Sequence, residues 1–125
     1  MHAPTATPEA ESQTPTSTAY VLVVLKPGEN RDDYRHHASG HIEFVDNLIK
    51  RNRILLGGAF ATGAGYADAA YVLRASSIAA AQAIAAADPF VINGVCQLEC
   101  FEWELIGINP DAVDETLIVR PDDIG

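Results

Sequence analysis

A histidine on an apolar helical stripe is the first side chain in this sequence that could do chemistry. His41 precedes Phe44, Val45 and Leu48 at the spacing of one helical face, so its ring is expected to point toward the protein core. Histidine titrates near neutral pH and can serve as a general base or acid. The alternative is a core histidine that hydrogen-bonds to a backbone carbonyl. The spacing leaves both uses open.

Metal binding is a third use of this histidine. His37 lies one turn before His41, and both could reach one cation if the helix is continuous. A zinc site needs three or four ligands. Cys96 and Cys100 alternate with acidic residues along a strand pattern and do not form a Cys-x-x-Cys pair. We therefore expect no native metal.

Asp88 is the second candidate, and it follows an alanine-rich helix in the stretch AIAAADPFVING. Aspartate is favoured as a helix N-cap and proline at the first helical position, so Asp88 and Pro89 can open one helical turn that Gly94 closes. Capping alone accounts for these residues. It also leaves Asp88 near the entrance of the last strand, where a loop residue can face a cleft.

Other side chains give weaker signals. Arg74, at the end of the third expected strand, could anchor a carboxylate or form a salt bridge at the sheet edge. Tyr71 and Trp103 are expected to fill a dimer core. The glycines from Gly57 to Gly65 are not followed by a helix with Lys or Ser/Thr, so they do not form a phosphate loop. No serine has the setting of a nucleophile elbow, and no cofactor motif is present, so we expect no cofactor.

Four strands and two helices are expected to position these residues. The strands are AYVLVVLKPG, RILLGGAF, AAYVLRA and the alternating GVCQLECFEWELIGI. The first helix ends before Asn52, which can take the left-handed conformation. The second, IAAAQAIAAA, follows Ser76 or Ser77 as its cap.

The order βαββαβ predicts the fold class. It is the α+β, ferredoxin-like pattern, an antiparallel four-stranded sheet with both helices on one face. The last strand places Phe101, Trp103 and Leu105 on a single side, and two helices cannot bury both sides of one sheet. We expect two copies to pack sheet against sheet as a homodimer, a dimeric α/β barrel.

Composition divides the chain into three parts. Residues 1–18 are rich in Pro, Thr and Ala and indicate a disordered leader without the features of a secretory signal. Residues 19–106 are expected to form the domain. Residues 107–125 form an acidic tail, in which the run TLIV could add a short strand, for example onto a neighbouring subunit.

Charge and cysteine content narrow the function classes. The formal net charge is −9, which disfavours nucleic acid as a partner because its binding depends on clustered Lys and Arg. On one strand, Cys96 and Cys100 would lie about 13 Å apart at roughly 3.3 Å per residue, too far for a disulfide. Reduced cysteines and the lack of a long apolar stretch predict a cytoplasmic protein with no membrane partner.

Two blocks of the sequence resemble a known family. HIEFVDNLIKRNRILLGG, residues 41–58, and SIAAAQAIAAADPFVINGV, residues 77–95, are similar to the two signatures of the YciI-like (YCII) proteins. These are a histidine that opens an apolar helix before a Leu-rich strand, and an Ala-rich helix that ends in Asp-Pro-aromatic. The likeness runs from about residue 20 to residue 105. The chain departs from the pattern at Asn52, where glycine is usual, at Ala59, where proline is usual, and at Thr62 and Gly63, where an acidic residue is often seen.

The resemblance implies a dimeric α/β barrel whose active site is a His–Asp pair, here His41 and Asp88. Family members with assigned reactions are small cofactor-free enzymes that act on ring-derived acids or lactones, for example by eliminating chloride. We therefore expect proton transfer that leads to isomerisation or elimination on a small organic acid or lactone, with Arg74, Gly58 and Phe90 as substrate-binding residues. The alternative is a non-catalytic dimer that holds a small ligand or engages a partner through its acidic tail.

Overall fold

A computed structural model describes residues 19–61 and 65–119 of the chain. The strands are β1 (Ala19–Pro27), β2 (Ile54–Ala59), β3 (Ala69–Ala75) and β4 (Cys96–Glu102). The helices are α2 (Tyr34–Lys50), α3 (Ile78–Ala85) and the one-turn α4 (Pro89–Ile92). Short 3-10 helices form at Arg31–Asp33, Pro110–Ala112 and Glu115–Leu117. The expected α+β order is confirmed, and α4 is the helical turn expected after Asp88.

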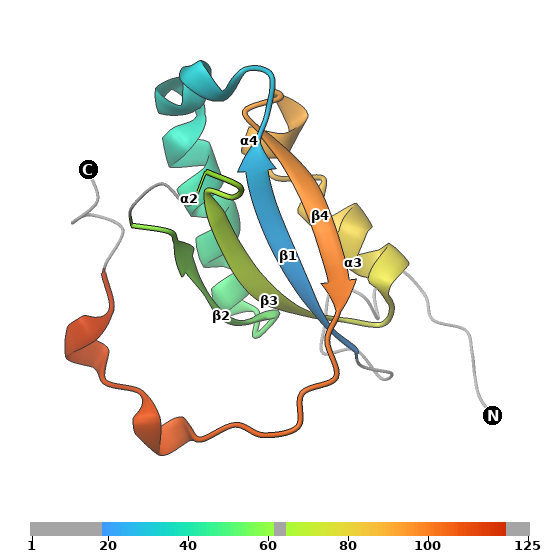
Figure 1. Ribbon diagram of the computed structural model, residues 1–125, viewed down its shortest axis with the longest axis vertical. Helices are drawn as coiled ribbons and strands as arrows, with labels where there is room; N and C mark the ends of the chain where they lie inside the picture. Colours follow the sequence, from blue (N-terminus) through green and yellow to red (C-terminus); the bar gives the residue numbers. More distant parts are fainter. Residues whose placement is uncertain (1–18, 62–64, 120–125) are drawn as a thin grey trace.

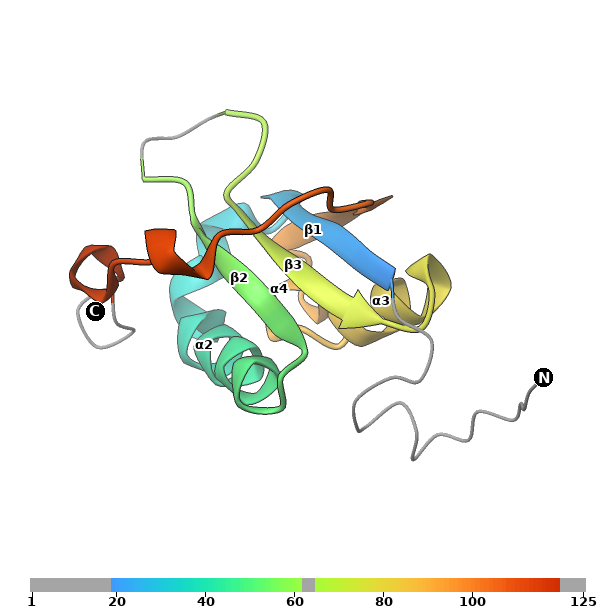
Figure 2. The same ribbon diagram turned by 90° about the horizontal axis from the view of Figure 1, so that it is seen from below.

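The four strands form one antiparallel sheet in the order β2-β3-β1-β4 (Figure 1). In this order each helix connects two strands that have a third strand between them, which is the ferredoxin-like arrangement. The helices α2 and α3 lie on the same side of the sheet (Figure 2). The predicted fold class is therefore confirmed for the single chain.

The residues that begin and end the helices act as the sequence indicates. Asn52, after α2, adopts the left-handed conformation with φ 60°, which asparagine tolerates better than most residues. The Ser77 hydroxyl accepts a hydrogen bond from the Ala80 N–H at 3.0 Å and caps α3. Gly94 follows α4 with φ 73°. Helix α2 runs unbroken through Gly40, so one helix carries all the histidines of the described part of the chain.

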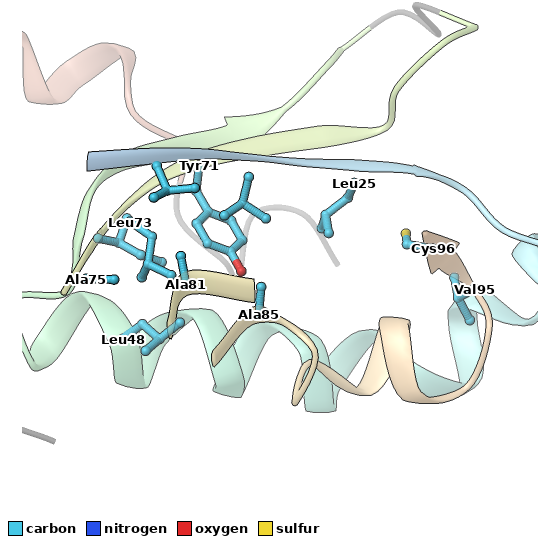
Figure 3. Close-up of a cluster of buried hydrophobic side chains, with 12 residues drawn as sticks. Leu25, Leu48, Tyr71, Leu73, Ala75, Ala81, Ala85, Val95 and Cys96 are labelled. Carbon is cyan, nitrogen blue, oxygen red and sulfur yellow. The ribbon is translucent and has the colours of Figure 1, made fainter. Parts of the chain in front are cut away.

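The core lies between the sheet and the helices (Figure 3). Alternate residues of the two central strands point to this side, namely Val21, Val23 and Leu25 of β1 and Tyr71, Leu73 and Ala75 of β3. They pack with Leu48 of α2 and with Ala81 and Ala85 of α3. Because the two alanines carry only methyl groups, α3 can lie close to the sheet.

The predicted place of Tyr71 in a dimer core is wrong. Its side chain points to the helices and is buried in the core of the single chain. The alternation along β3 explains the placement, because Arg74 and Val72 point to the opposite side of the sheet and Tyr71 does not.

The face of the sheet opposite the helices, called the open face below, carries a group of apolar side chains together with Arg74 and the Lys26–Glu99 ion pair. The exposed apolar side chains are Leu56, Phe101 and Trp103, with 63%, 46% and 47% of their surface accessible. Val72 at its centre is buried. In the described part of the chain, α2, α3 and α4 all leave this face uncovered, and the segment after β4 runs along part of it (Figure 2). We therefore keep the expectation that a second copy of the chain covers the exposed apolar side chains of this face.

The segment after β4 departs from the predicted pattern. The strand ends at Glu102, and the chain then crosses to the β2 edge (Figure 1). There Trp103 and Leu105 help to line a hollow of about 170 Å³ on the open face, together with Leu55, Leu56, Val72, Gly107 and Ile108. The predicted TLIV strand is not present in the chain. Its first residues form a 3-10 helix, because the Asp114 carboxylate accepts a hydrogen bond from the Thr116 N–H and caps a turn.

Three further expectations concern the ends of the chain, membrane-spanning helices and the two cysteines. Residues 1–18 and 120–125 lie outside the described residues, so the leader and the end of the acidic tail stay predictions. Across residues 19–61 and 65–119, no helix is long and apolar enough to cross a bilayer. Both cysteines are free, as their spacing on one strand predicts.

The fit between β2 and β3 generates a stability prediction. A methyl group added at Gly57 would stand 2.5 Å from the Tyr71 Cβ, whereas one added at Gly58 meets nothing within 4 Å. Gly57→Ala should therefore lower the free energy of unfolding by about 1–3 kcal/mol through overpacking. Gly58→Ala, the matched control, should leave stability unchanged or raise it slightly by restricting the unfolded chain. Urea unfolding of both variants measures this, and equal stabilities would contradict the packing described.

Candidate active site

The side chains of His41 and Asp88 are in direct contact. His41 Nδ1 lies 2.8 Å from Asp88 Oδ2 and 3.0 Å from Oδ1. The Asp88 side chain is fully buried, and 17% of the His41 side chain is accessible. An ionised carboxylate only accepts hydrogen bonds, so Nδ1 is assigned as the donor. The contact joins the middle of α2 to the residue that precedes α4.

Local structure brings these two elements together. Asp88 is the N-cap of α4, and its Oδ1 accepts a hydrogen bond from the Phe90 N–H at 2.9 Å. A methyl group added at Gly40 would stand 3.2 Å from the Pro89 ring, so glycine lets α2 pass close to the start of α4. The Asp88 carboxylate therefore serves as a cap and as the partner of His41 at the same time.

Phe90 restricts the orientation of the His41 imidazole ring. The rings of Phe90 and His41 are stacked, with centroids 4.2 Å apart and planes 10° from parallel. With Nδ1 directed at Asp88 and one ring face covered by Phe90, the imidazole has little freedom to turn. Its second nitrogen, Nε2, makes no hydrogen bond with the described residues. This nitrogen is the atom that can exchange a proton with a bound molecule.

The burial of Asp88 makes its pairing with His41 energetically important. An ionised carboxylate removed from water is costly unless hydrogen bonds or an opposite charge compensate it. Here the compensation comes from the Phe90 N–H and from His41 Nδ1. If His41 takes a proton at Nε2, the resulting imidazolium lies against this carboxylate and is stabilised by it. The arrangement can therefore accept and release a proton next to a fixed negative charge.

Tyr71 is another buried polar group of the core, and the sequence reasoning assigned it no site role. It is 3% exposed, and its hydroxyl has no hydrogen-bond partner among the described residues. Burial raises the pKa of this hydroxyl above its usual range, and the negative charge of Asp88 raises it further. A buried hydroxyl without a partner costs about 1–3 kcal/mol. The sequence did contain a signal for the inward direction of Tyr71. Arg74 lies three positions further along the same strand, so the two side chains point to opposite sides of the sheet, and a charged side chain favours the side away from the core.

The structure separates the other predicted site residues. Phe90 lies against His41. Arg74 and Gly58 do not reach the pair, because they pair with Tyr20 and Ala70 on the open face of the sheet. The predicted substrate-binding roles of these residues stay predictions, and two of them would act on the side of the sheet away from His41.

The histidines and cysteines do not gather around one point. His36 and His37 meet edge to face, with ring centroids 6.2 Å apart. Within the described ranges, no group of three or more His, Cys, Asp and Glu side chains could hold a metal ion. The cysteines lie on β4, where burial raises the pKa of the Cys96 thiol to about 11 and also raises that of Cys100.

The sequence of the folded part of the chain is similar to known proteins. The family model of the YCII-related domain matches residues 18–104, which include all of the secondary structure up to the end of β4. A protein of Bacillus subtilis (strain 168), described as uncharacterized protein YjpA, is 38% identical over 71 residues. The aligned part is 57% of this chain and 80% of that protein.

The double role of Asp88 generates a prediction. Asp88→Asn keeps an oxygen that can cap α4 but loses the charge next to His41, whereas Asp88→Ala loses both. The free energy of unfolding should fall by about 1–2 kcal/mol in the first variant, and by about 1 kcal/mol more in the second through loss of the cap. Urea unfolding near neutral pH measures both losses. Asp46→Asn, at an exposed carboxylate of α2, is the control and should show no measurable loss.

An Asp88→Asn variant as stable as the parent would contradict the importance of the buried contact. An Asp88→Ala variant no less stable than Asp88→Asn would contradict the role of the cap.

Proposed function

The chain belongs to the family of YCII-related domains, and from this premise we propose that it is a small cofactor-independent enzyme that moves a proton on a small organic acid or lactone. The observation that carries the proposal is the 2.8 Å contact between His41 Nδ1 and the buried Asp88 carboxylate. It leaves Nε2 as the basic nitrogen of a ring whose orientation is fixed. This is the arrangement that general base catalysis requires.

In the proposed reaction, His41 Nε2 takes a proton from a carbon next to a carbonyl or carboxyl group of the substrate. The electron pair of the broken C–H bond moves into the substrate as an enolate, and the imidazolium is stabilised by Asp88. In an isomerisation, His41 returns the proton to another carbon. In an elimination such as a dehydrohalogenation, the electron pair expels a leaving group as an anion, and the proton is later released to water.

The proposal assigns each side chain one task. His41 carries the proton, Asp88 holds the tautomer and balances the charge, and Phe90 restricts the ring and offers an apolar surface to the substrate. A positioned base of this kind contributes about 10²- to 10⁴-fold to the rate. Arg74 and Gly58 lie on the open face, so a substrate-binding role for them would require a ligand held between two copies.

Homodimerisation through the open face is part of the proposal. The face is apolar and half-exposed at Leu56, Phe101 and Trp103, and a large exposed apolar patch on a folded chain favours an interaction surface. Two copies packed sheet against sheet would cover it and form the dimeric α/β barrel. The same observation favours the alternative function, a non-catalytic dimer that binds a small ligand or assembles with a partner.

A ligand screen tests the enzymatic proposal. Small organic acids, lactones and halogenated analogues are added to the protein, and thermal unfolding is followed. A ligand at 100 times its Kd should stabilise the parent by about 2.7 kcal/mol. His41→Ala should lose this stabilisation, whereas His37→Ala, one turn away on the same helix, should keep it.

Each binding ligand is then incubated with the protein in D₂O, and the hydrogen next to its carbonyl is followed by NMR. The proposal predicts exchange for deuterium that depends on His41. Ligands that bind without any exchange or product would contradict the enzyme and favour the binding module.

The dimer proposal generates a separate prediction. Phe101→Glu places a charge on the open face, so it should weaken the dimer by at least about tenfold, because a charge buried in an apolar interface lacks a partner. Ile92→Glu, at an exposed site of α4 on the helix side, should leave the mass unchanged. Sedimentation velocity over a range of concentrations measures both. A parent protein that stays monomeric throughout would contradict the sheet-to-sheet dimer.

A further inference from the structure

The connection between β1 and α2 is hydrogen-bonded to the connection between α4 and β4. The Gly28 N–H donates to the Val95 carbonyl at 2.8 Å, and the Asn30 N–H donates to the Gly94 carbonyl at 2.8 Å. These bonds extend the pairing of β1 with β4, whose last member on β1 is Pro27. The segment that leads into α2 and the segment that leaves α4 are therefore held side by side at one end of the sheet (Figure 1).

Two glycines allow these segments to approach so closely. A methyl group added at Gly28 would overlap with the Gly94 carbonyl oxygen, and one added at Gly94 would stand 2.8 Å from Asn30 Nδ2. The two connections thus touch through their backbones, with no space between them for another side chain.

The Asn30 side chain adds a third bond between the two connections. Asn30 stands at the N-cap position of the 3-10 helix Arg31–Asp33, where asparagine is a favoured cap of its own helix, but its side chain makes no such bond. Its Nδ2 donates instead to the Asn93 carbonyl at 3.0 Å. The side chain therefore serves the contact with the segment after α4 and not the helix that it precedes.

The start of α2 is itself attached to the sheet. The Arg31 guanidinium donates two hydrogen bonds to the Asp68 carboxylate, each 3.0 Å long. The Asp68 N–H in turn donates to the Leu25 carbonyl of β1 at 2.8 Å. Asn30, which precedes Arg31, therefore binds the segment after α4 from a position that the sheet fixes.

Asn93 connects this contact with the histidine–aspartate pair. Its Nδ2 and its N–H both donate to the Pro89 carbonyl, at 2.8 Å and 3.1 Å, so it is attached to the first residue of α4. A helix of one turn is not stable by itself, so the placement of α4 depends on the contacts at its ends. Its first end carries Asp88 and Phe90, which contact His41. A displaced α4 would move both away from the imidazole.

We propose that Asn30 is a positioning residue of the candidate site, whose side-chain amide binds α4 to the start of α2 and so keeps Asp88 and Phe90 against His41. Asn30 acts through α4, because its own side chain bonds with the Asn93 carbonyl. The inference rests on the proposed function for its purpose, since a catalytic base must keep one orientation to meet its substrate.

Hydrogen exchange followed by NMR tests the proposal in the free protein. The Phe90 N–H and the His41 Nδ1–H both donate to the Asp88 carboxylate and report on the start of α4. The Ala80 N–H, which donates to the Ser77 hydroxyl, reports on the equivalent position of α3. Loss of one hydrogen bond in Asn30→Ala should speed exchange at Phe90 and His41 by about fivefold through local opening. Exchange at Ala80 should stay within about twofold of the parent.

Two further variants make the test specific. Asn30→Asp keeps the size of the side chain but replaces the donor with an acceptor, so it should speed exchange at Phe90 and His41 in the same way. Asn109→Ala is the control, because the Asn109 side chain accepts a hydrogen bond from the Asp111 N–H at an exposed place away from the pair. It should leave every one of these exchange rates unchanged.

Unchanged exchange at Phe90 and His41 in Asn30→Ala overturns the proposal. Equal acceleration at Phe90 and Ala80 also overturns it, because Asn30 would then support the whole fold and not the site. No substrate is needed, so the outcome is separate from that of the ligand screen. Faster exchange without turnover of any ligand would reject the enzyme and keep the positioning role. Turnover with unchanged exchange would keep the enzyme and reject the role of Asn30.

Discussion

A fully buried carboxylate is the constraint on which the rest of this structure depends. Asp88 lies out of contact with water, so the fold must supply hydrogen-bond donors on the spot. The Phe90 N–H supplies one because α4 begins there, and His41 supplies another because α2 passes within reach. The close passage is favoured by glycine at position 40, where an added methyl group would stand 3.2 Å from the Pro89 ring. A helix cap, a helix crossing and an imidazole orientation are thus fixed by one side chain.

The residues with strong local rules could be predicted from the sequence. The direction of His41 follows from its position on an apolar helical face, and the capping roles of Ser77, Asn52 and Asp88 follow from their positions next to helices. The contact between His41 and Asp88 could not be predicted from such local rules. Helical periodicity gives a direction but no partner, and only the resemblance to a family suggested which carboxylate stands opposite.

Features that depend on tertiary packing could not be predicted in the same way. Tyr71 was assigned to a dimer core because aromatic residues fill both kinds of core, and only the alternation with Arg74 fixes its side. The TLIV run has the composition of a strand, yet a cap at Asp114 makes a 3-10 turn there. Arg74 and Gly58 were chosen by residue type, and the sheet places them on the face away from the pair.

The sheet separates two regions with different physical character. Its helix side holds the polar and titratable groups around Asp88, which are shielded from water. Its open face carries exposed apolar side chains, among them Leu56, Phe101 and Trp103. In the proposed function the first region does the chemistry and the second holds two copies together, so substitutions on one face should leave the property of the other intact.

The central claim is that Asp88 holds His41 as the Nδ1–H tautomer with Nε2 free to take a proton. The ¹⁵N chemical shifts of the His41 ring, measured above its titration midpoint, report directly which nitrogen carries the hydrogen. The account predicts a protonated Nδ1 and an unprotonated Nε2 in the parent, with this preference lost in Asp88→Asn. A neutral ring protonated mainly at Nε2 would contradict it, because Nδ1 could then not donate to the Asp88 carboxylate.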